Sequence, residues 1–349
     1  MEVISMLQVR DRLSSFSSKF KLLLYALLFL ILLSLPMLIR GAYYRHIVIF
    51  TLMYIMLAQA WNLIGGYAGQ ISLGNVVFFG IGAYTSTILL IRANITPWIG
   101  MWIGGIIAVA VSLALGYSVF RLKGHYFAMA TLALGEITRI SFTNWRFVGA
   151  AQGISLPLHI PSIYYMEWSN KIPYYYIILS MTVLTTIFVN RLDKSRFGFY
   201  AKAIKQDEIA ARSRGISAFK LKQSAFALNA FITALAGTFY AQYILYISPE
   251  ANLHMTNSIL IVVIAIIGGC GTVLGPILGT IFVFPLTEFL RAQLGGQAMG
   301  LNYILFGAAA IFVVLVEPRG FVALKDRIKR AITLIIKSRG GIESGSAKG

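Results

Sequence analysis

Side chains able to do chemistry are sparse in this 349-residue sequence, and their spacing does not suit catalysis. The four histidines, His46, His125, His159 and His254, lack the short separations that are typical of metal-binding sites. The sequence contains no G-x-x-x-x-G-K-[ST] phosphate loop, no H-E-x-x-H zinc motif and no G-x-S-x-G nucleophile elbow. We therefore expect a protein that is not an enzyme and that binds neither a metal nor a cofactor.

Two pairs of oppositely charged residues are spaced for ion pairing on a helix: Glu136 with Arg139, and Glu288 with Arg291. Residues three apart lie on the same helical face, so the members of each pair can meet. Both pairs fall near the ends of apolar segments, where a helix-end ion pair with snorkelling side chains is one interpretation. Ionisable residues at membrane depth are also functional candidates, and the second interpretation is a charged outer rim that docks an extracytoplasmic partner.

Two glycine-rich segments, at 65–75 and 268–279, interrupt stretches that are otherwise apolar. Glycine destabilises a regular helix, and unwound backbone within a membrane is tolerated only where protein or a water-filled cavity surrounds it. Broken helices of this kind line substrate paths in many transporters, but tight turns with close helix packing through glycine explain the pattern equally well. The candidate path residues are Asn62, Gly65, Gly66, Gly69, Gln70, Ser72, Gly74, Asn75, Gly268, Gly269 and Gly271.

The composition places these residues in a membrane protein. Hydrophobic residues make up 58% of the chain and charged residues 12%, with a mean hydropathy of +0.77. Soluble domains are about 45–50% apolar and about 25% charged. Long apolar runs predict helices, so we expect an all-α polytopic transmembrane bundle with glycine-broken helices and about ten spans. The expected spans are 22–39, 46–64, 73–91, 98–120, 124–142, 173–190, 223–247, 257–275, 276–291 and 302–317.

Basic residues set the expected orientation of the spans. The net charge is +18, and Lys and Arg crowd into the segment 191–222 and the C-terminal tail, whereas the loop 143–172 is poorer in charge. Cytoplasmic loops are enriched in Lys and Arg, so both termini are expected in the cytoplasm of a cell with a bacterial inner or plasma membrane. This crowding between apolar runs argues against nucleic acid as a partner. We divide the chain into a cytoplasmic N-terminal segment (1–21), a transmembrane domain (22–317) and a basic cytoplasmic tail (318–349).

The segment 191–222 contains the most distinctive short helix of the sequence. Residues 201–214 place Ile204 and Ile209 among charged residues, which predicts an amphipathic helix, and Gly215 is a suitable C-terminal stop. A basic amphipathic helix beside a membrane could lie on anionic lipid. The alternative is a docking helix that fits a cleft on a cytoplasmic partner.

Several motifs together resemble one transporter family. They are N-L-I-G-G-Y-A-G-Q-I-S-L-G-N (62–75), G-A-Y (82–84), G-H-Y-F-A-M-A-T-L-A-L-G-E-I-T-R (124–139), D-E-I-A-A-R-S-R-G-I (207–216), G-G-C-G-T-V-L-G-P-I-L-G (268–279) and E-P-R-G-F (317–321). Over nearly its whole length the chain resembles the larger membrane subunit of the branched-chain amino acid ABC importers. The pattern at 207–216 is similar to the E-A-A…G cytoplasmic loop of ABC importer permeases, which couples the membrane subunit to the ATPase.

The resemblance implies an ABC importer permease-like fold and a set of partners. These would be a second, related permease subunit in a heterodimer, two cytoplasmic ATPase subunits, an extracytoplasmic solute-binding protein and membrane lipid. ATP hydrolysis would take place in the ATPase subunits, and branched-chain amino acids would pass between the two permeases. The implied coupling residues are Ala201, Ile204, Asp207, Glu208, Ala210, Ala211 and Gly215.

One position departs from the family pattern and bears on the substrate. After Asn144 and Trp145 the family tends toward T-G-G-x-x-G-I, whereas here Ala150 stands in place of a glycine. Urea or short amides, carried by close relatives of the family, are the alternative substrates. A secondary transporter working alone often carries a membrane-embedded acid, whereas Glu136 and Glu288 are expected at the periphery. A membrane enzyme would require a polar catalytic cluster, which we do not find in the sequence.

Overall fold

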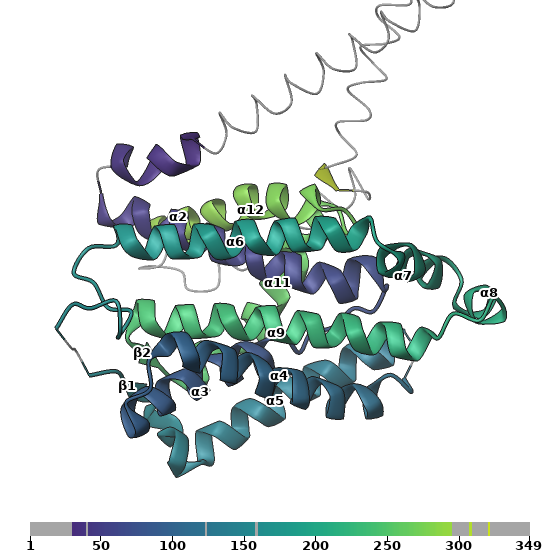
Figure 1. Ribbon diagram of the computed structural model, residues 1–349, viewed down its shortest axis with the longest axis horizontal. Coiled ribbons are helices and arrows are strands. Elements are labelled where there is room, and N and C mark those ends of the chain that lie inside the picture. Colours follow the sequence, from purple (N-terminus) through teal and green to yellow (C-terminus); the bar gives the residue numbers. More distant parts are fainter. Residues whose placement is uncertain are drawn as a thin grey trace, which may run out of the picture.

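A computed structural model describes residues 30–39, 41–122, 124–157 and 160–294, together with residues 307, 308, 320 and 321. Within this part of the chain the structure is a bundle of long helices (Figure 1). Seven helical segments of the described residues are long and apolar enough to cross a membrane. This confirms the expected all-α polytopic bundle.

Long helices make up most of the described chain. Residues 30–38 are helical. The long helices that follow are α2 (Ala42–Asn62), α3 (Asn75–Ala93), α4 (Pro97–Val119), α5 (His125–Asn144), α6 (Ile172–Asp193), α9 (Ala218–Ile244), α11 (Met255–Gly268) and α12 (Leu274–Leu294). The shorter elements are the π-helical turn η1 (Leu63–Tyr67), the 3-10 turns η2 (Arg146–Val148) and η3 (Ala150–Gln152), the helices α7 (Arg196–Gln206), α8 (Glu208–Ser213) and α10 (Pro249–Asn252), and the antiparallel strands β1 (Ile154–Ser155) and β2 (Tyr246–Ile247).

Helix α9 runs through the middle of the bundle and connects two groups of helices (Figure 1). It packs most extensively against α3 and α4, which also pack against each other, and it contacts α2 as well. Helix α2 packs in turn against α6 and α12, and α12 packs along α11. All residues from Leu52 to Ala68 are buried. A helix enclosed on every side is expected to be apolar on nearly every side, which explains why this part of the sequence is apolar apart from Gln59 and Asn62.

A glycine allows α3 and α9 to approach each other closely. A Cβ atom on Gly82 would lie 1.9 Å from the carbonyl oxygen of Ala234, so no side chain fits at this position. The Thr238 hydroxyl donates a hydrogen bond to the Gly82 carbonyl oxygen at 3.0 Å. Membrane helices lack a hydrophobic driving force between them and associate through such close contacts of small and polar residues.

The ends of the eighth and ninth expected spans are wrong. We expected the break between residues 275 and 276, but α11 ends at Gly268 and α12 begins at Leu274. Pro276 therefore lies in the first turn of α12, where its missing N–H group breaks no intrahelical bond. Most of the first expected span, the tenth span except residues 307 and 308, and nearly all of both terminal segments lie outside the described residues.

The single amphipathic helix expected over residues 201–214 is also wrong, because the structure has two helices there. Asp207 adopts extended backbone angles (φ −153°, ψ 108°) between α7 and α8. Its carboxylate accepts hydrogen bonds from the backbone N–H groups of Ile209 at 2.8 Å and Ala210 at 3.0 Å. An aspartate at this position is a strong N-cap and starts a new helix. Gly215, with φ +82°, follows the end of α8 as expected.

The two ends of the bundle carry different elements (Figure 1). Helices α7 and α8 lie at one end, which we call the basic end because the Lys- and Arg-rich segment 191–222 forms it. Strands β1 and β2 lie at the opposite end, which we call the strand end.

Candidate coupling and transport sites

The two glycine-rich segments meet at the basic end of the bundle. The side chain of Asn62, which is fully buried, joins them. Its Nδ2 donates to the carbonyl oxygen of Thr272 at 2.9 Å, and its Oδ1 accepts from the backbone N–H of Gly271 at 2.8 Å. Lys205 of α7 donates from Nζ to the carbonyl oxygen of Gly66 at 2.8 Å. We call this group of Asn62, Gly66, Lys205, Gly271 and Thr272 the glycine junction.

Close backbone contact explains why the junction requires glycine. A Cβ atom on Gly66 would lie 2.6 Å from the backbone nitrogen of Gly271 and 1.8 Å from the Asn62 Oδ1. Gly66 also belongs to η1, the π-helical turn that follows α2. Single π-helical turns are often found at functional sites. The junction is therefore both tightly packed and locally irregular.

The structure places the candidate path residues in two environments. Gly69 is exposed, and Gln70 and Gly271 are partly exposed. The buried members are Asn62, Gly65, Gly66, Ser72, Gly74, Asn75, Gly268 and Gly269. The junction thus contains the close packing through glycine that was one of the two interpretations, while the role of these residues in lining a path stays a prediction.

A buried polar cluster follows the first glycine segment. Asn229 of α9 donates from Nδ2 to Oδ1 of Asn75 at 2.9 Å, and Thr233 donates to Asn229 Oδ1 at 3.3 Å. The backbone N–H of Val76 donates to the Ser258 hydroxyl at 3.1 Å. Sequence reasoning missed Asn229, Thr233 and Ser258. The available signal was the spacing of Asn229 and Thr233, which are four residues apart in an apolar span and so share one face.

Helices α7 and α8 are fastened to the bundle by ion pairs and apolar contacts. Lys202 of α7 pairs with Asp193 of α6 at 2.5 Å, and Glu208 of α8 pairs with Lys222 of α9 at 2.7 Å. Among the expected coupling residues, Ala201, Ile204 and Ala211 are buried, and Asp207 caps α8. Ile209 is 78% exposed, so α8 presents an apolar residue to its surroundings.

Glu208 is the charged centre of this attachment. Burial of its carboxyl group tends to raise its pKa, but the hydrogen bond and charge of Lys222, together with Arg212, hold the pKa below its ordinary value. The side chain of Lys222 is only 8% exposed. Glu208 therefore stays ionised at neutral pH and neutralises a largely buried lysine.

Both predicted charge pairs form ion pairs near the strand end. Arg139 contacts Glu136 at 2.5 Å, and Arg291 contacts Glu288 at 2.9 Å. Arg139 also contacts Glu250 of α10 at 2.7 Å, and the Nε2 atom of His254 lies 3.7 Å from Glu250. Sequence reasoning missed Glu250 and His254, although their spacing of four residues is a signal for helical pairing.

Comparison with known proteins identifies the family. The family described as "branched-chain amino acid transport system / permease component" matches residues 43–314. The chain belongs to this family. The high-affinity branched-chain amino acid transport system permease protein LivM of Escherichia coli (strain K12) is 29% identical to this permease, over 88% of this chain and 76% of LivM. The probable LivM of Methanocaldococcus jannaschii is 26% identical, over 79% of this chain and 92% of that protein.

A more limited similarity extends to sugar transport. The fructose import permease protein FrcC of Rhizobium meliloti is 27% identical over 41% of this chain and 40% of FrcC. No solved structure matches the permease.

The family assignment confirms the central interpretation of the sequence. The protein is a multi-pass membrane permease and a subunit of a branched-chain amino acid ABC importer. Permeases of this family are transport subunits rather than enzymes themselves, and they work with other transporter subunits. Among the described residues of the permease, no group of three or more His, Cys, Asp or Glu residues is placed to hold a metal ion.

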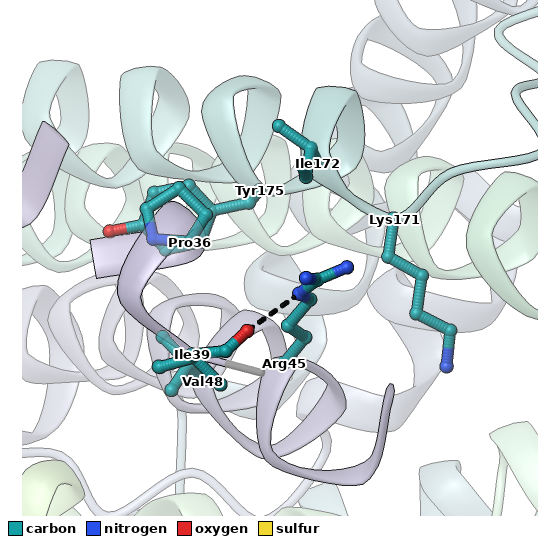
Figure 2. Close-up of a pocket in the computed structure, with 7 residues that line it drawn as sticks. All are labelled: Pro36, Ile39, Arg45, Val48, Lys171, Ile172 and Tyr175. Carbon is teal, nitrogen blue, oxygen red and sulfur yellow. Dashed lines mark hydrogen bonds between the residues drawn. The ribbon is translucent and has the colours of Figure 1, made fainter. Parts of the chain in front are cut away.

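A niche between the helix at 30–38, α2 and α6 is too small for a substrate. Figure 2 shows its lining, in which Arg45 donates from Nε to the carbonyl oxygen of Ile39 at 3.0 Å. Its volume is about 10 Å³. A cavity of that size holds at most a single water molecule.

Proposed function

We propose that this permease forms a heterodimer with a second, related permease and translocates branched-chain, hydrophobic amino acids. Two cytoplasmic ATPase subunits would drive transport, and an extracytoplasmic binding protein would deliver the amino acid. Family membership over residues 43–314 and the similarity to LivM support this assembly. The observation that carries the proposal is the hydrogen bond from Lys205 to Gly66, because it joins the loop at the basic end directly to the break between two spans.

Helices α7 and α8 are suited to pass movement from an ATPase into the bundle. The exposed Ile209 is available to fill a cleft on that partner. Ion pairs connect α7 to α6 through Lys202 and α8 to α9 through Glu208, so displacement of α8 would be felt by both long helices. We assign coupling to the expected set, which is Ala201, Ile204, Asp207, Glu208, Ala210, Ala211 and Gly215.

We assign the substrate path to the surface beside the first glycine segment and α5. Gly69 and Gln70 are the accessible candidates on this surface. The buried candidates of the first glycine segment would support its backbone by packing beneath it. Most of helix α5 is not buried within this chain, since only Phe127, Thr131 and Gly135 are buried. The helix is nevertheless not among those that are apolar enough to span a membrane alone. A long helix with these properties suits contact with a second subunit or a water-filled path better than contact with lipid.

The charge distribution supports an orientation with the basic end in the cytoplasm and both termini on that side. The strand end then faces the extracytoplasmic space, where a binding protein would dock. We assign the docking rim to the predicted residues Glu136, Arg139, Glu288 and Arg291, and we extend it to Glu250 and His254 because Glu250 contacts Arg139. Charged groups at an interface favour rapid and specific association more than high affinity.

Uptake by proteoliposomes tests the proposal. The permease is reconstituted with its second permease and two ATPases, ATP is enclosed, and the binding protein is added outside with labelled leucine. We expect accumulation that requires both ATP and the binding protein, and that valine and isoleucine inhibit while urea and short amides do not. Ion-driven, ATP-independent uptake by this chain alone would overturn the proposal.

A further inference from the structure

A cavity of about 200 Å³ lies in the half of the bundle nearer the strand end. It is lined by residues of α2, α3, α9, α10, α11 and α12, so it lies within this one chain. Of the thirteen described residues that line it, five are aromatic: Phe50, Tyr54, Phe79, Tyr240 and Phe284. The ring of Tyr54 stacks on that of Phe284 at 4.5 Å, and the rings of Phe79 and Tyr240 meet edge to face at 5.3 Å. These ring contacts give the aromatic part of the wall an ordered arrangement.

Two opposite charges belong to the same cavity. Glu288 and Arg291 of α12 line it, and their side chains contact each other at 2.9 Å. The Glu288 side chain is 18% exposed and the Arg291 side chain is 54% exposed, so the carboxylate is largely covered while the guanidinium reaches outward. Asn257 adds an amide group to the lining. The cavity thus combines aromatic and aliphatic side chains with polar groups, of which one is anionic and one is cationic.

We propose that this cavity binds an aliphatic α-amino acid in its zwitterionic form. The aliphatic side chain lies against the aromatic wall, the ammonium group binds Glu288 and the carboxylate binds Arg291. The ammonium and carboxylate groups of an α-amino acid are attached to one carbon, which suits two protein charges that are themselves in contact. This site rests on the proposed function and deepens it, because it gives this subunit a substrate site of its own, apart from the surface beside α5.

The size of the cavity selects the ligand class. An apolar cavity of roughly 150 Å³ is known to hold benzene, whereas drug-sized ligands occupy about 300–1,000 Å³. A cavity of about 200 Å³ therefore suits a ligand only slightly larger than benzene, as leucine, isoleucine and valine are. An amino acid with a charged side chain would place an unpaired charge among the rings, which is strongly unfavourable. Glycine would leave the aromatic wall unused.

Direct binding of labelled leucine tests the inference. The complete transporter is purified in detergent and assayed by equilibrium dialysis without the binding protein and without nucleotide. We expect saturable binding that isoleucine and valine compete and that lysine and glutamate do not. Because hydrogen bonds to charged groups are among the strong ones, Glu288→Gln and Arg291→Gln should each weaken binding about tenfold or more. Arg291→Lys should restore part of the loss, since it keeps the charge.

A matched control separates this site from general effects of removing charge. Arg45 lies near the same end of the bundle but lines the small niche of Figure 2 and not the cavity. Arg45→Gln should leave leucine binding unchanged. The melting temperature of each variant, measured on the same preparation, shows whether it is folded.

Three results would overturn the inference: no binding by the wild-type transporter, binding that Glu288→Gln leaves unchanged, or an equal loss in Arg45→Gln. ATP-driven leucine uptake with the binding protein present is measured in parallel on the wild type. If that uptake is intact, the proposed function stands and only the cavity assignment fails. If the wild type shows no ATP-driven amino acid uptake, the proposed function itself fails.

Discussion

Lys205 of α7 donates a hydrogen bond from Nζ to the carbonyl oxygen of Gly66 at a distance of 2.8 Å. The same carbonyl oxygen lies close to the second glycine segment, since a Cβ atom on Gly271 would be 3.0 Å from it. One lysine therefore contacts the point at which both broken segments meet. Any displacement of α7 must either move the glycine junction or break this bond.

Replacing this lysine should separate ATP hydrolysis from transport. A hydrogen bond to a charged group contributes about 1.5–3 kcal/mol, so loss of the contact in Lys205→Met should lower coupled transport by about tenfold or more. ATPase activity of the complex should fall much less. Both rates are measured in the same proteoliposomes, with Lys194→Met as the control because Lys194 is an exposed lysine of the same segment. Equal losses of transport and hydrolysis would show that Lys205 does not couple them.

Asn62 should be essential for the stability of the junction. Asn62→Leu keeps the approximate size of the side chain but leaves the Gly271 N–H and the Thr272 carbonyl without their partner. Two backbone groups left unsatisfied in a partly buried contact should lower the free energy of unfolding by about 1–3 kcal/mol. The midpoint of thermal unfolding in detergent measures the change. Asn144→Leu is the control, since Asn144 is exposed and bonds within its own helix, and a similar loss there would contradict this assignment.

The sequence predicted those parts of the fold that depend on interactions between residues close together in the chain. Continuous apolar runs located the long helices, because a helix is the structure that satisfies its backbone within a membrane. The i, i+3 spacing of Glu136 with Arg139 and of Glu288 with Arg291 correctly predicted two ion pairs. The N-cap at Asp207 was not predicted, because the amphipathic pattern of residues 201–214 continues through it.

The remaining features depend on contacts between distant parts of the sequence. The Asn62 side chain bonds to Gly271, which is 209 residues away, and Arg139 bonds to Glu250, which is 111 residues away. The spacing of apolar residues along the sequence does not specify such pairings. They depend on how α2 packs against the turn between α11 and α12, and on how α5 packs against α10. The cavity beside Glu288 could not be predicted from the sequence for the same reason, since its lining comes from six helices.

Gly66→Ala tests whether the junction tolerates even one methyl group. The added Cβ would lie 2.6 Å from the backbone nitrogen of Gly271, and a rigid backbone cannot easily move away. Overpacking of a tight site costs about 1–3 kcal/mol, so the unfolding midpoint and the yield of folded permease should both fall. Gly135→Ala in α5 is the matched control. A Cβ atom at this position would lie 3.5 Å from the Val76 side chain, which is an ordinary van der Waals contact. Because alanine stabilises a helix relative to glycine, the unfolding midpoint of Gly135→Ala should equal or exceed that of the wild type. A Gly66→Ala variant as stable as wild type would contradict the close packing.

Stability at the basic end should depend on pH through Glu208. Burial tends to raise the pKa of this carboxyl, but Lys222 and Arg212 hold it below its ordinary value. A lowered pKa in the folded state gives a stabilisation that is present above the unfolded pKa of about 4.3 and is lost as the pH falls through the folded pKa.

Glu208→Gln, which leaves the buried Lys222 without its charge partner, should therefore lower the free energy of unfolding by about 1–3 kcal/mol at pH 7. The difference between wild type and variant should shrink as the pH is lowered below 4. Unfolding midpoints of both proteins at matched pH values measure it, and a difference that grows in acid would contradict the assigned ion pair.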